Sequence, residues 1–259
     1  MKKPVIGLAL GSGAAKGYAH IGVLQVLEKE NIPIDIIVGS SMGSLIGALY
    51  ASGIDANMLE KLSKQIHRKQ WVDLVVPKVG LIAGDKIKAI IQLLTKNKSF
   101  EELNIKLGVI ATDLISKESV LISKGNVAEA VRASIAIPGI FCPGVINGIP
   151  LFDGGVLERV PVKQAKLMGA DIVIGVELGF SSTDKVNNIY DILFQTFDVM
   201  GREIQSLKRY ECDILITPEL SKIDYLAFNQ VSSCILRGCE ATEKVLPIIK
   251  QCIEDKENI

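Results

Sequence analysis

The sequence around Ser41 reads Gly-Ser-Ser-Met-Gly, a G-x-S-x-G pattern that can present a serine hydroxyl as a nucleophile. A strand-like run, Ile34–Val38, precedes the pattern, and a helix-like run, Met42–Ala51, follows the serine. Gly39 and Gly43 are needed on either side, because so tight a turn leaves no room for neighbouring side chains. A turn that only packs a helix against a strand has the same composition, and this alternative stays open. The pattern makes Ser41 the candidate nucleophile of a hydrolase.

A second small-residue turn, residues 11–17 (Gly-Ser-Gly-Ala-Ala-Lys-Gly), follows a strand-like run and opens a helix. Such a loop presents several backbone N–H groups to an anion. A P-loop would end in Gly-Lys-Ser or Gly-Lys-Thr, whereas Lys16 here precedes Gly17. A dinucleotide site would have its acid after the second strand, whereas Asp35 stands at the start of that strand. The interpretation that remains is an oxyanion hole whose amides face Ser41 across neighbouring strand ends.

Asp153 opens an Asp-Gly-Gly sequence and is the candidate base. The chain has only two histidines, His20 and His67, and neither follows the acid as the histidine of an α/β-hydrolase triad does. His67 lies in a polar helical stretch typical of a solvated surface. His20 lies one turn into a helix, where packing or capping accounts for it. A serine–aspartate dyad fits better, with Gly154 and Gly155 letting the backbone bring the carboxylate near the serine.

Short apolar runs alternate with helical patterns along the chain. The runs lack polar alternation, as expected of strands that are covered on both faces. The predicted strands are Val5–Leu10, Ile34–Val38, Ile105–Ala111, Ser119–Ile122, Ile172–Val176 and Ile214–Thr217. The predicted helices are Lys16–Glu30, Met42–Ala51, Ala56–His67, Asp85–Thr95, Val127–Ser134, Asn188–Tyr210 and Ser232–Ile253. This alternation predicts an α/β layered domain with a largely parallel sheet.

The segment Phe141–Phe152 departs from the alternation. Asn147-Gly148 stands there between two apolar stretches, and this dipeptide favours the type I′ turn of a β-hairpin. The predicted hairpin delivers Asp153 at its exit. Because no linker, repeat or low-complexity run divides the chain, we expect residues 1–259 to form a single domain.

Composition excludes several classes of function. Lys+Arg and Asp+Glu both number 29 and aromatic residues make up only 5%, so nucleic acid is not an expected partner. Two histidines and an odd number of cysteines without a CxxC pair give neither a metal site nor a disulfide framework. No apolar stretch reaches membrane-span length without glycine or charge, and no secretory leader is recognisable. We therefore expect a cytoplasmic protein without metal or cofactor.

Together and in this order, the motifs resemble those of the patatin-like phospholipases, specifically their short bacterial members. The resemblance runs from Val5 to about Asp213, and it includes Tyr-Ala-His-Ile-Gly at residues 18–22 and Arg-Ala-Ser-Ile-Ala-Ile-Pro at residues 132–138. It implies a three-layer α/β/α sandwich with a mostly parallel central sheet. It also implies two-step hydrolysis of an acyl ester in lipid metabolism, without a cofactor.

The resemblance assigns roles by position. Ser41 would attack the acyl carbonyl and Asp153 would take its proton. The oxyanion loop would comprise Gly11, Ser12, Gly13, Ala14, Lys16 and Gly17. The loop departs from the family's pattern, because the glycine triplet reads Ser-Gly-Ala and lysine replaces arginine. We expect Ala14 to narrow the allowed backbone and Gly13 to occupy backbone space closed to other residues.

Substrate and partners are less closely defined by the sequence. The expected substrate is an acyl lipid or another ester, and a phospholipase, a carboxylesterase and a thioesterase would use the same residues. A non-catalytic adaptor with this scaffold is a further alternative, against which the intact serine and aspartate argue. Transient contact with the inner face of a membrane fits a lipid substrate, and the oligomeric state stays open. The apolar segment Trp71–Ile82 has two interpretations, a lid or acyl wall and a part of the core.

Overall fold

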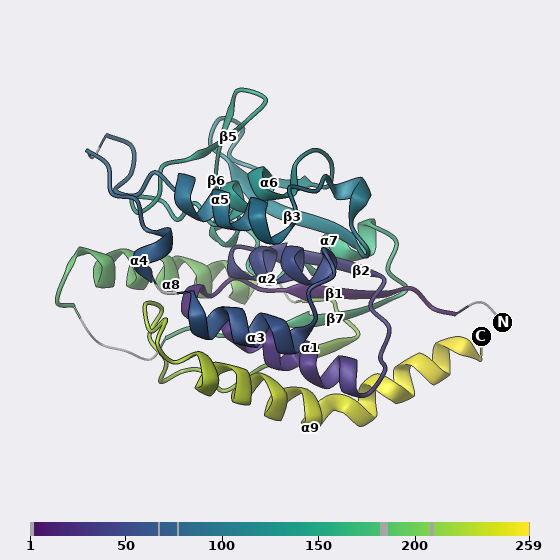
Figure 1. The fold of residues 1–259 in the computed structure, drawn as a ribbon. Coiled ribbons are helices and arrows are strands. Elements are labelled where there is room, and N and C mark those ends of the chain that lie inside the picture. Colours follow the sequence, from purple (N-terminus) through teal and green to yellow (C-terminus); the bar gives the residue numbers. More distant parts are fainter. Residues whose placement is uncertain (1–2, 67, 77, 182–185, 208–209, 259) are drawn as a thin grey trace.

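Eight strands form one mixed sheet in the part of the chain that the structure describes. The structure is a computed structural model that describes residues 3–66, 68–76, 78–181, 186–207 and 210–258 (Figure 1). The strands are β1 (Ile6–Leu10), β2 (Ile36–Ser40), β3 (Lys106–Asp113), β4 (Ser119–Ile122), β5 (Gly144–Ile146), β6 (Ile149–Asp153), β7 (Ile172–Val176) and β8 (Ile214–Ile216). They lie in the order β5-β6-β3-β2-β1-β7-β8, with β4 paired to β3. Strands β3, β2, β1, β7 and β8 are mutually parallel, whereas β4 and β6 pair antiparallel with β3.

Helices cover both faces of this sheet. The α-helices are α1 (Ala19–Lys29), α2 (Met42–Ala51), α3 (Ala56–Gln65), α4 (Arg68–Trp71), α5 (Asp85–Leu94), α6 (Val127–Ser134), α7 (Val162–Leu167), α8 (Ile189–Leu207) and α9 (Val231–Glu257). Short 3-10 helices are η1 (Ala14–Tyr18), η2 (Phe100–Glu102) and η3 (Gly154–Val156). None of the helices in the described part of the chain has both the length and the apolarity that crossing a bilayer requires.

Alternate side chains of the central strands enter two separate cores. Leu8 and Ile37 join the large core with α1, α2 and α9, whereas Ala9 and Val38 join a smaller core with α7. Both sets are fully buried, because successive side chains of a strand point to opposite faces. This arrangement confirms the expected α/β/α sandwich around a mostly parallel sheet.

The predicted elements are present, with shifts at their ends. The α-helix predicted from Lys16 begins three residues later, at Ala19, because residues 14–18 form the 3-10 helix η1, and α9 ends four residues later than predicted. Strand β2 begins and ends two residues later than the predicted Ile34–Val38, because Ile36 is the first residue to pair with both neighbouring strands. The predicted hairpin is confirmed. Asn147 and Gly148 have φ angles of 52° and 78°, as a type I′ turn requires. Helices α4 and α7 were not predicted, since four and six residues are too few to establish a helical period.

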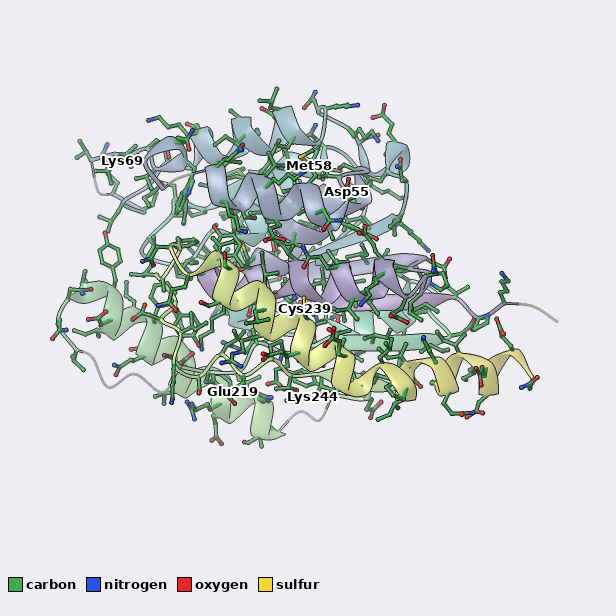
Figure 2. All side chains as sticks on the ribbon, turned by 60° about the horizontal axis from the view of Figure 1, so that its bottom comes forward. Asp55, Met58, Lys69, Glu219, Cys239 and Lys244 are labelled. Carbon is green, nitrogen blue, oxygen red and sulfur yellow. The ribbon has the colours of Figure 1, made fainter. Side chains whose placement is uncertain are left out.

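The long helix α9 lies across α1, the helix that follows the glycine-rich loop (Figure 2). Glycine makes the close approach possible on both helices. A side chain at Gly22 of α1 would collide with the carbonyl of Ile235, and one at Gly238 of α9 would collide with the carbonyl of Ala19. Cys239, labelled in Figure 2, donates a hydrogen bond from its thiol to the carbonyl of Gly22 at 3.5 Å. This contact anchors the helix that the loop leads into.

Candidate active site

Ser41 lies on the tight turn between β2 and α2. Its backbone has φ 52° and ψ −122°, a strained conformation for a residue with a side chain. The two glycines around it are required by space. A Cβ on Gly39 would lie 2.5 Å from the carbonyl of Gly43, and a Cβ on Gly43 would collide with the carbonyl of Leu10 on β1. The sequence pattern thus marks a turn in which the backbone itself fills the space that side chains would need.

The polar groups of Ser41 all have partners. Its Oγ donates a hydrogen bond to Oδ2 of Asp153 at 2.5 Å, although 112 residues separate the two. Its backbone N–H donates to Oγ of Ser134 at 2.9 Å, and its carbonyl accepts from Oγ of Ser44 at 2.6 Å. These bonds fix both the strained backbone and the direction of the hydroxyl.

Asp153 is the last residue of β6, and both its backbone N–H and its carbonyl are hydrogen-bonded. Its N–H donates to the carbonyl of Ala136 at 3.0 Å, and its carbonyl accepts from Oγ1 of Thr112 at 2.9 Å. The second carboxylate oxygen, Oδ1, accepts from the N–H of Gly155 at 2.8 Å. A side chain at Gly154 would collide with the carbonyl of Ile110, so this position needs glycine for close packing against β3. Both glycines thus lie beside Asp153, one packed against β3 and the other bonded to the carboxylate.

Burial raises the pKa of the Asp153 carboxyl to about 6, since the charged form loses its hydration. The hydrogen bonds from Ser41 and Gly155 and the charge of Arg159 act in the opposite direction and favour the carboxylate. The balance leaves a carboxylate at neutral pH that is more basic than an exposed aspartate. Such a group can accept a proton from a hydroxyl within hydrogen-bonding distance.

The glycine-rich loop follows β1, and β1 pairs directly with β2. Two of its amides have structural partners. Gly11 donates to the carbonyl of Val176 at 3.1 Å, and Ser12 donates to the carbonyl of Arg159 at 2.8 Å. The next two amides, on residues 13 and 14, have no hydrogen-bond acceptor among the described residues. The loop therefore presents two consecutive free donors, fewer than the six residues expected from sequence.

The conformation of the loop corrects one expectation. Gly13 has φ 170°, an extended angle open to any residue, and the positive φ of the loop belongs to Ala14, at 46°. What restricts Gly13 is space, because a Cβ there would lie 2.6 Å from Cδ1 of Leu178. Ala14 was expected to narrow the range of backbone conformations that the loop can adopt. In the structure it has a left-handed φ although it carries a side chain.

Lys16 and Gly17 pack against the turn and position it. Lys16 is fully buried, donates its N–H to the carbonyl of Gly13 at 3.0 Å and holds Nζ 4.7 Å from the ring centre of Tyr225. Burial lowers the pKa of Lys16 to about 8. A side chain at Gly17 would collide with Met42, the residue after the nucleophile. These two residues position the loop and do not offer it further donors.

His20 lies under the loop, as the packing interpretation predicted. Its Nε2 is 2.7 Å from the carbonyl of Gly11, and burial lowers its pKa to about 4, so the ring is neutral and Nε2 is the donor. Among the described residues, no hydrogen bond joins His20 to Ser41 or Asp153. His67 lies outside the described residues.

Two cavities meet at Ser41 and Ala14. The first is almost entirely apolar, with a wall that includes Leu45, Leu49, Leu59, Ile87, Ile91 and Leu94. The second is lined by apolar side chains together with polar and charged ones, among them Asp153, Arg159, Asp198 and Tyr225, and we call it the polar cavity for these groups. An ester bond placed at Ser41 would have the apolar cavity on one side and the polar cavity on the other.

Different parts of the segment Trp71–Ile82 fit the two earlier interpretations, an acyl wall and a part of the core. Trp71 lines the apolar cavity, and Ile82 is buried in the large core. Leu74, Val76 and Val79 lie in neither, because they are exposed to solvent.

Sequence reasoning missed the roles of Ser134, Thr112 and Arg159, which hold the backbone of the nucleophile, the aspartate and the loop. Ser134 belongs to a segment that the family resemblance includes, and this was the only available signal. The partners are 41 to 147 residues apart from the groups they hold, so no local pattern links them. Within the described residues, no group of three or more His, Cys, Asp or Glu side chains is placed to hold a metal ion.

The fold and site define an α/β protein in which a strained serine turn and a buried aspartate meet at one sheet edge. A family model described as patatin-like phospholipase matches residues 8–166. The chain belongs to the patatin-like phospholipase family.

Relatives and solved structures agree with this assignment. An NTE family protein of Mycobacterium tuberculosis, itself named uncharacterized, is 36% identical over 181 residues, which cover 69% of this chain and 50% of that protein. A protein named lysophospholipase nte1 from Aspergillus fumigatus is 33% identical over 204 residues, 76% of this chain and 13% of the relative. The chain thus spans about half the length of the mycobacterial relative and a small part of the fungal one.

Two solved bacterial proteins share the fold. VipD of Legionella pneumophila has a TM-score of 0.70 at 14% identity, over 95% of this chain and 67% of that one. The type III effector ExoU has a TM-score of 0.56 at 14% identity, over 96% and 53%.

Proposed function

We propose that this protein hydrolyses acyl esters of lipids, with Ser41 as nucleophile and Asp153 as base. The observation that carries the proposal is the hydrogen bond of 2.5 Å from the Ser41 hydroxyl to a buried carboxylate with a raised pKa. The family and the relatives named lysophospholipase support an ester bond in a lipid as the target.

The proposed reaction has two steps. Asp153 takes the proton of Ser41 as Oγ attacks the acyl carbon, and the carbonyl oxygen becomes an oxyanion that accepts from the free amides of Gly13 and Ala14. When the tetrahedral intermediate collapses, the ester C–O bond breaks and the leaving alcohol takes the proton from Asp153. Water then attacks the acyl-enzyme with Asp153 again as base, and it releases the fatty acid and restores the serine.

The two cavities support an orientation for the substrate. The apolar cavity suits the acyl chain, and the polar cavity, with Arg159 in its wall, suits the leaving alcohol and its headgroup. A phospholipid, a lysophospholipid and a simple carboxylic ester all satisfy this arrangement. An acyl thioester would place its thiol in the polar cavity by the same reasoning, and a thioesterase is therefore the second candidate. We further propose a cytoplasmic location and transient contact with the inner face of a membrane, where such substrates are found.

The test uses the wild type and Ser41→Ala. Both proteins are treated with a fluorophosphonate probe, which labels activated serines, and assayed on p-nitrophenyl esters of increasing chain length, lysophospholipids and acyl thioesters. We expect labelling and hydrolysis by the wild type only. An unlabelled, inactive wild type would instead favour a non-catalytic adaptor.

A further inference from the structure

The loop after α4 is clamped at its base. Leu74 and Ile82 form an antiparallel bridge, and the N–H of Val75 donates to the carbonyl of Leu81 at 3.1 Å. Just before the bridge, the Asp73 carboxylate accepts from the N–H groups of Gly84 and Asp85 at 2.8 Å, at the start of α5. The loop therefore leaves the protein from a fixed base.

The base is itself tied to the core. The N–H groups of Leu81 and Ile82 both donate to the carbonyl of Ile140 at 2.9 Å. Buried Arg132 donates from Nε to the carbonyl of Gly84 at 3.1 Å and from Nη2 to that of Cys142 at 2.8 Å. Side chains beyond this base have their direction set by the core of the protein.

Four aliphatic side chains at the base and beyond it face solvent. Leu74 is 78% exposed, Val76 83%, Val79 64% and Val75 38%. We call these four residues the apolar tip. Exposing four neighbouring aliphatic side chains to water is unfavourable in free energy. Contact with an apolar phase would remove this cost.

The apolar tip lies at the edge of the sheet where the candidate site opens. Figure 1 shows the loop after α4 at the left, the side toward which the carboxyl end of β1 runs. Trp71, three residues before Leu74, lines the apolar cavity that begins at Ser41. The wall of that cavity thus continues along the chain into the apolar tip.

The surroundings of the tip carry positive charge. Residues 69–79 include Lys69 and Lys78 against a single acid, Asp73, whose carboxylate is used at the start of α5. Figure 2 shows Lys69 near the margin of the molecule, at the upper left of the view. No ion pair engages Lys69 or Lys78 within the described part of the chain. Aliphatic side chains beside unpaired cations suit the surface of a bilayer, which has an apolar interior under anionic headgroups.

We propose that the apolar tip inserts into the surface of an anionic phospholipid bilayer and sets the mouth of the apolar cavity against it. The inference rests on the proposed function in one respect, because the bilayer would supply the lipid substrate. Insertion would let an acyl chain pass from the bilayer toward Ser41 past Trp71 with little exposure to water. The lysines would add affinity for anionic lipid that falls with ionic strength.

The first experiment measures co-sedimentation with vesicles of phosphatidylcholine plus phosphatidylglycerol and with vesicles of phosphatidylcholine alone. The variant Val76→Ser/Val79→Ser removes apolar surface without adding charge. Its matched control is Leu167→Ser, since Leu167 is 72% exposed at the end of α7, at the opposite edge of the sheet. We expect wild type and control to bind anionic vesicles alike, and the double variant to bind at least about tenfold more weakly.

A second pair of measurements separates the two contributions. Lys69→Gln/Lys78→Gln should lower binding to anionic vesicles several-fold and remove its salt dependence. Trp71 is the only tryptophan of the chain, so a blue shift of its fluorescence on vesicle addition reports contact near the tip. Equal binding by the valine double variant and wild type, or no vesicle binding by wild type, overturns the proposal. Self-association that the valine changes abolish, without vesicle binding, would assign the tip to a second copy and also overturn it.

Two controls distinguish failure of the proposed hydrolase function from failure of the proposed membrane insertion. Ser41→Ala should bind vesicles as wild type does, since insertion needs no chemistry. The valine double variant should hydrolyse a soluble short-chain p-nitrophenyl ester at the wild-type rate and lose activity only on vesicle lipid. Wild type that binds vesicles but hydrolyses no ester contradicts the proposed function alone, whereas hydrolysis without vesicle binding contradicts the insertion alone.

Discussion

The turn after β2 and the turn after β1 are built alike and bonded differently. Each leads from a parallel strand into a helix at the same sheet edge, and each holds a non-glycine residue at positive φ, Ser41 at 52° and Ala14 at 46°. Around Ser41 the amide, the carbonyl and the hydroxyl all have protein partners. In the other turn, the amides of Gly13 and Ala14 have none within the described residues. The first turn holds a reactive group in place, and the second leaves donors free for a ligand.

The two turns also differ in what restricts their glycines. Around Ser41, side chains at Gly39 and Gly43 would meet backbone carbonyls, which cannot move aside. In the other turn, a side chain at Gly11 would also meet a backbone carbonyl, that of Val176, but one at Gly13 would meet Cδ1 of Leu178, the end of a side chain. Gly13 should therefore tolerate more change than Gly39 or Gly43, and the predictions below test the two turns in order of expected effect.

The largest effect should come from Ser41→Ala. Loss of the nucleophile should reduce kcat by roughly 10⁴-fold or more, because no other hydroxyl of the described residues donates to the Asp153 carboxylate. The temperature of thermal unfolding should change little, since the hydrogen bond from the Ser41 N–H to Ser134 does not involve the removed oxygen. Steady-state kinetics and circular dichroism check both points, and activity above about a tenth of wild type would contradict the role of Ser41.

Asp153→Asn should be nearly as damaging, since a neutral amide cannot take the proton of Ser41. In the wild type, kcat/KM should rise with pH through about 6, the pKa of the buried carboxyl. An isosteric variant whose activity and pH profile match the wild type would exclude Asp153 as the base.

The same group makes a prediction for stability. The folded pKa of Asp153 is raised to about 6 from an ordinary value of 3.8, so the folded protein binds this proton more tightly than the unfolded chain. The resulting stabilisation is complete below pH 3.8 and is lost as pH rises through about 6. At pH 8 Asp153→Asn should therefore melt at or above the wild-type temperature, and a large drop in Tm would show that the ionised carboxylate stabilises the fold.

Gly13→Val should lower kcat by about 10²–10³-fold if the turn after β1 stabilises an oxyanion, because the added side chain would displace the two free amides. Leu178→Ala in the same chain should recover part of the activity, since it removes the atom 2.6 Å from the new Cβ. Activity equal to wild type in the single variant would mean that this turn only starts a helix.

Ser134→Ala should have a smaller effect, about tenfold in kcat. The variant leaves the buried amide of Ser41 without an acceptor, at a cost of roughly 1–3 kcal/mol, and loosens the strained turn. The nucleophile and base remain, so the pH profile should keep its midpoint near 6 while kcat falls. A Cys or Thr at position 134, which can still accept a hydrogen bond, should recover activity if the role is positioning.

Ala14→Gly should have the smallest effect. Glycine adopts the φ of 46° without the left-handed penalty of about 1–2 kcal/mol, and its greater freedom in the unfolded chain offsets part of that gain. We expect the free energy of unfolding to rise by up to about 1 kcal/mol in urea denaturation, with the amide and the activity kept. A marked loss of activity would mean that the Ala14 methyl group contacts the substrate.

The sequence by itself determined the features that depend on neighbouring residues. Gly39 and Gly43 around Ser41 mark the strained turn, because only a residue without a side chain fits there. The Asn147-Gly148 hairpin follows from the two positive φ angles that its turn requires. The alternation of apolar runs with helical patterns predicted a layered α/β domain with a largely parallel sheet, since these periods are local.

Only the tertiary structure decided how the loop residues divide their work. Gly11 and Ser12 donate to the carbonyls of Val176 and Arg159, which reach them from more than 140 residues away, and so the free amides fall on Gly13 and Ala14. The same holds for Trp71–Ile82, where apolar composition alone does not separate a buried side chain from an exposed one. Packing against Ile140 and Arg132 turned one end of that segment inward and left Val76 and Val79 in solvent, because burial depends on which distant residues lie opposite.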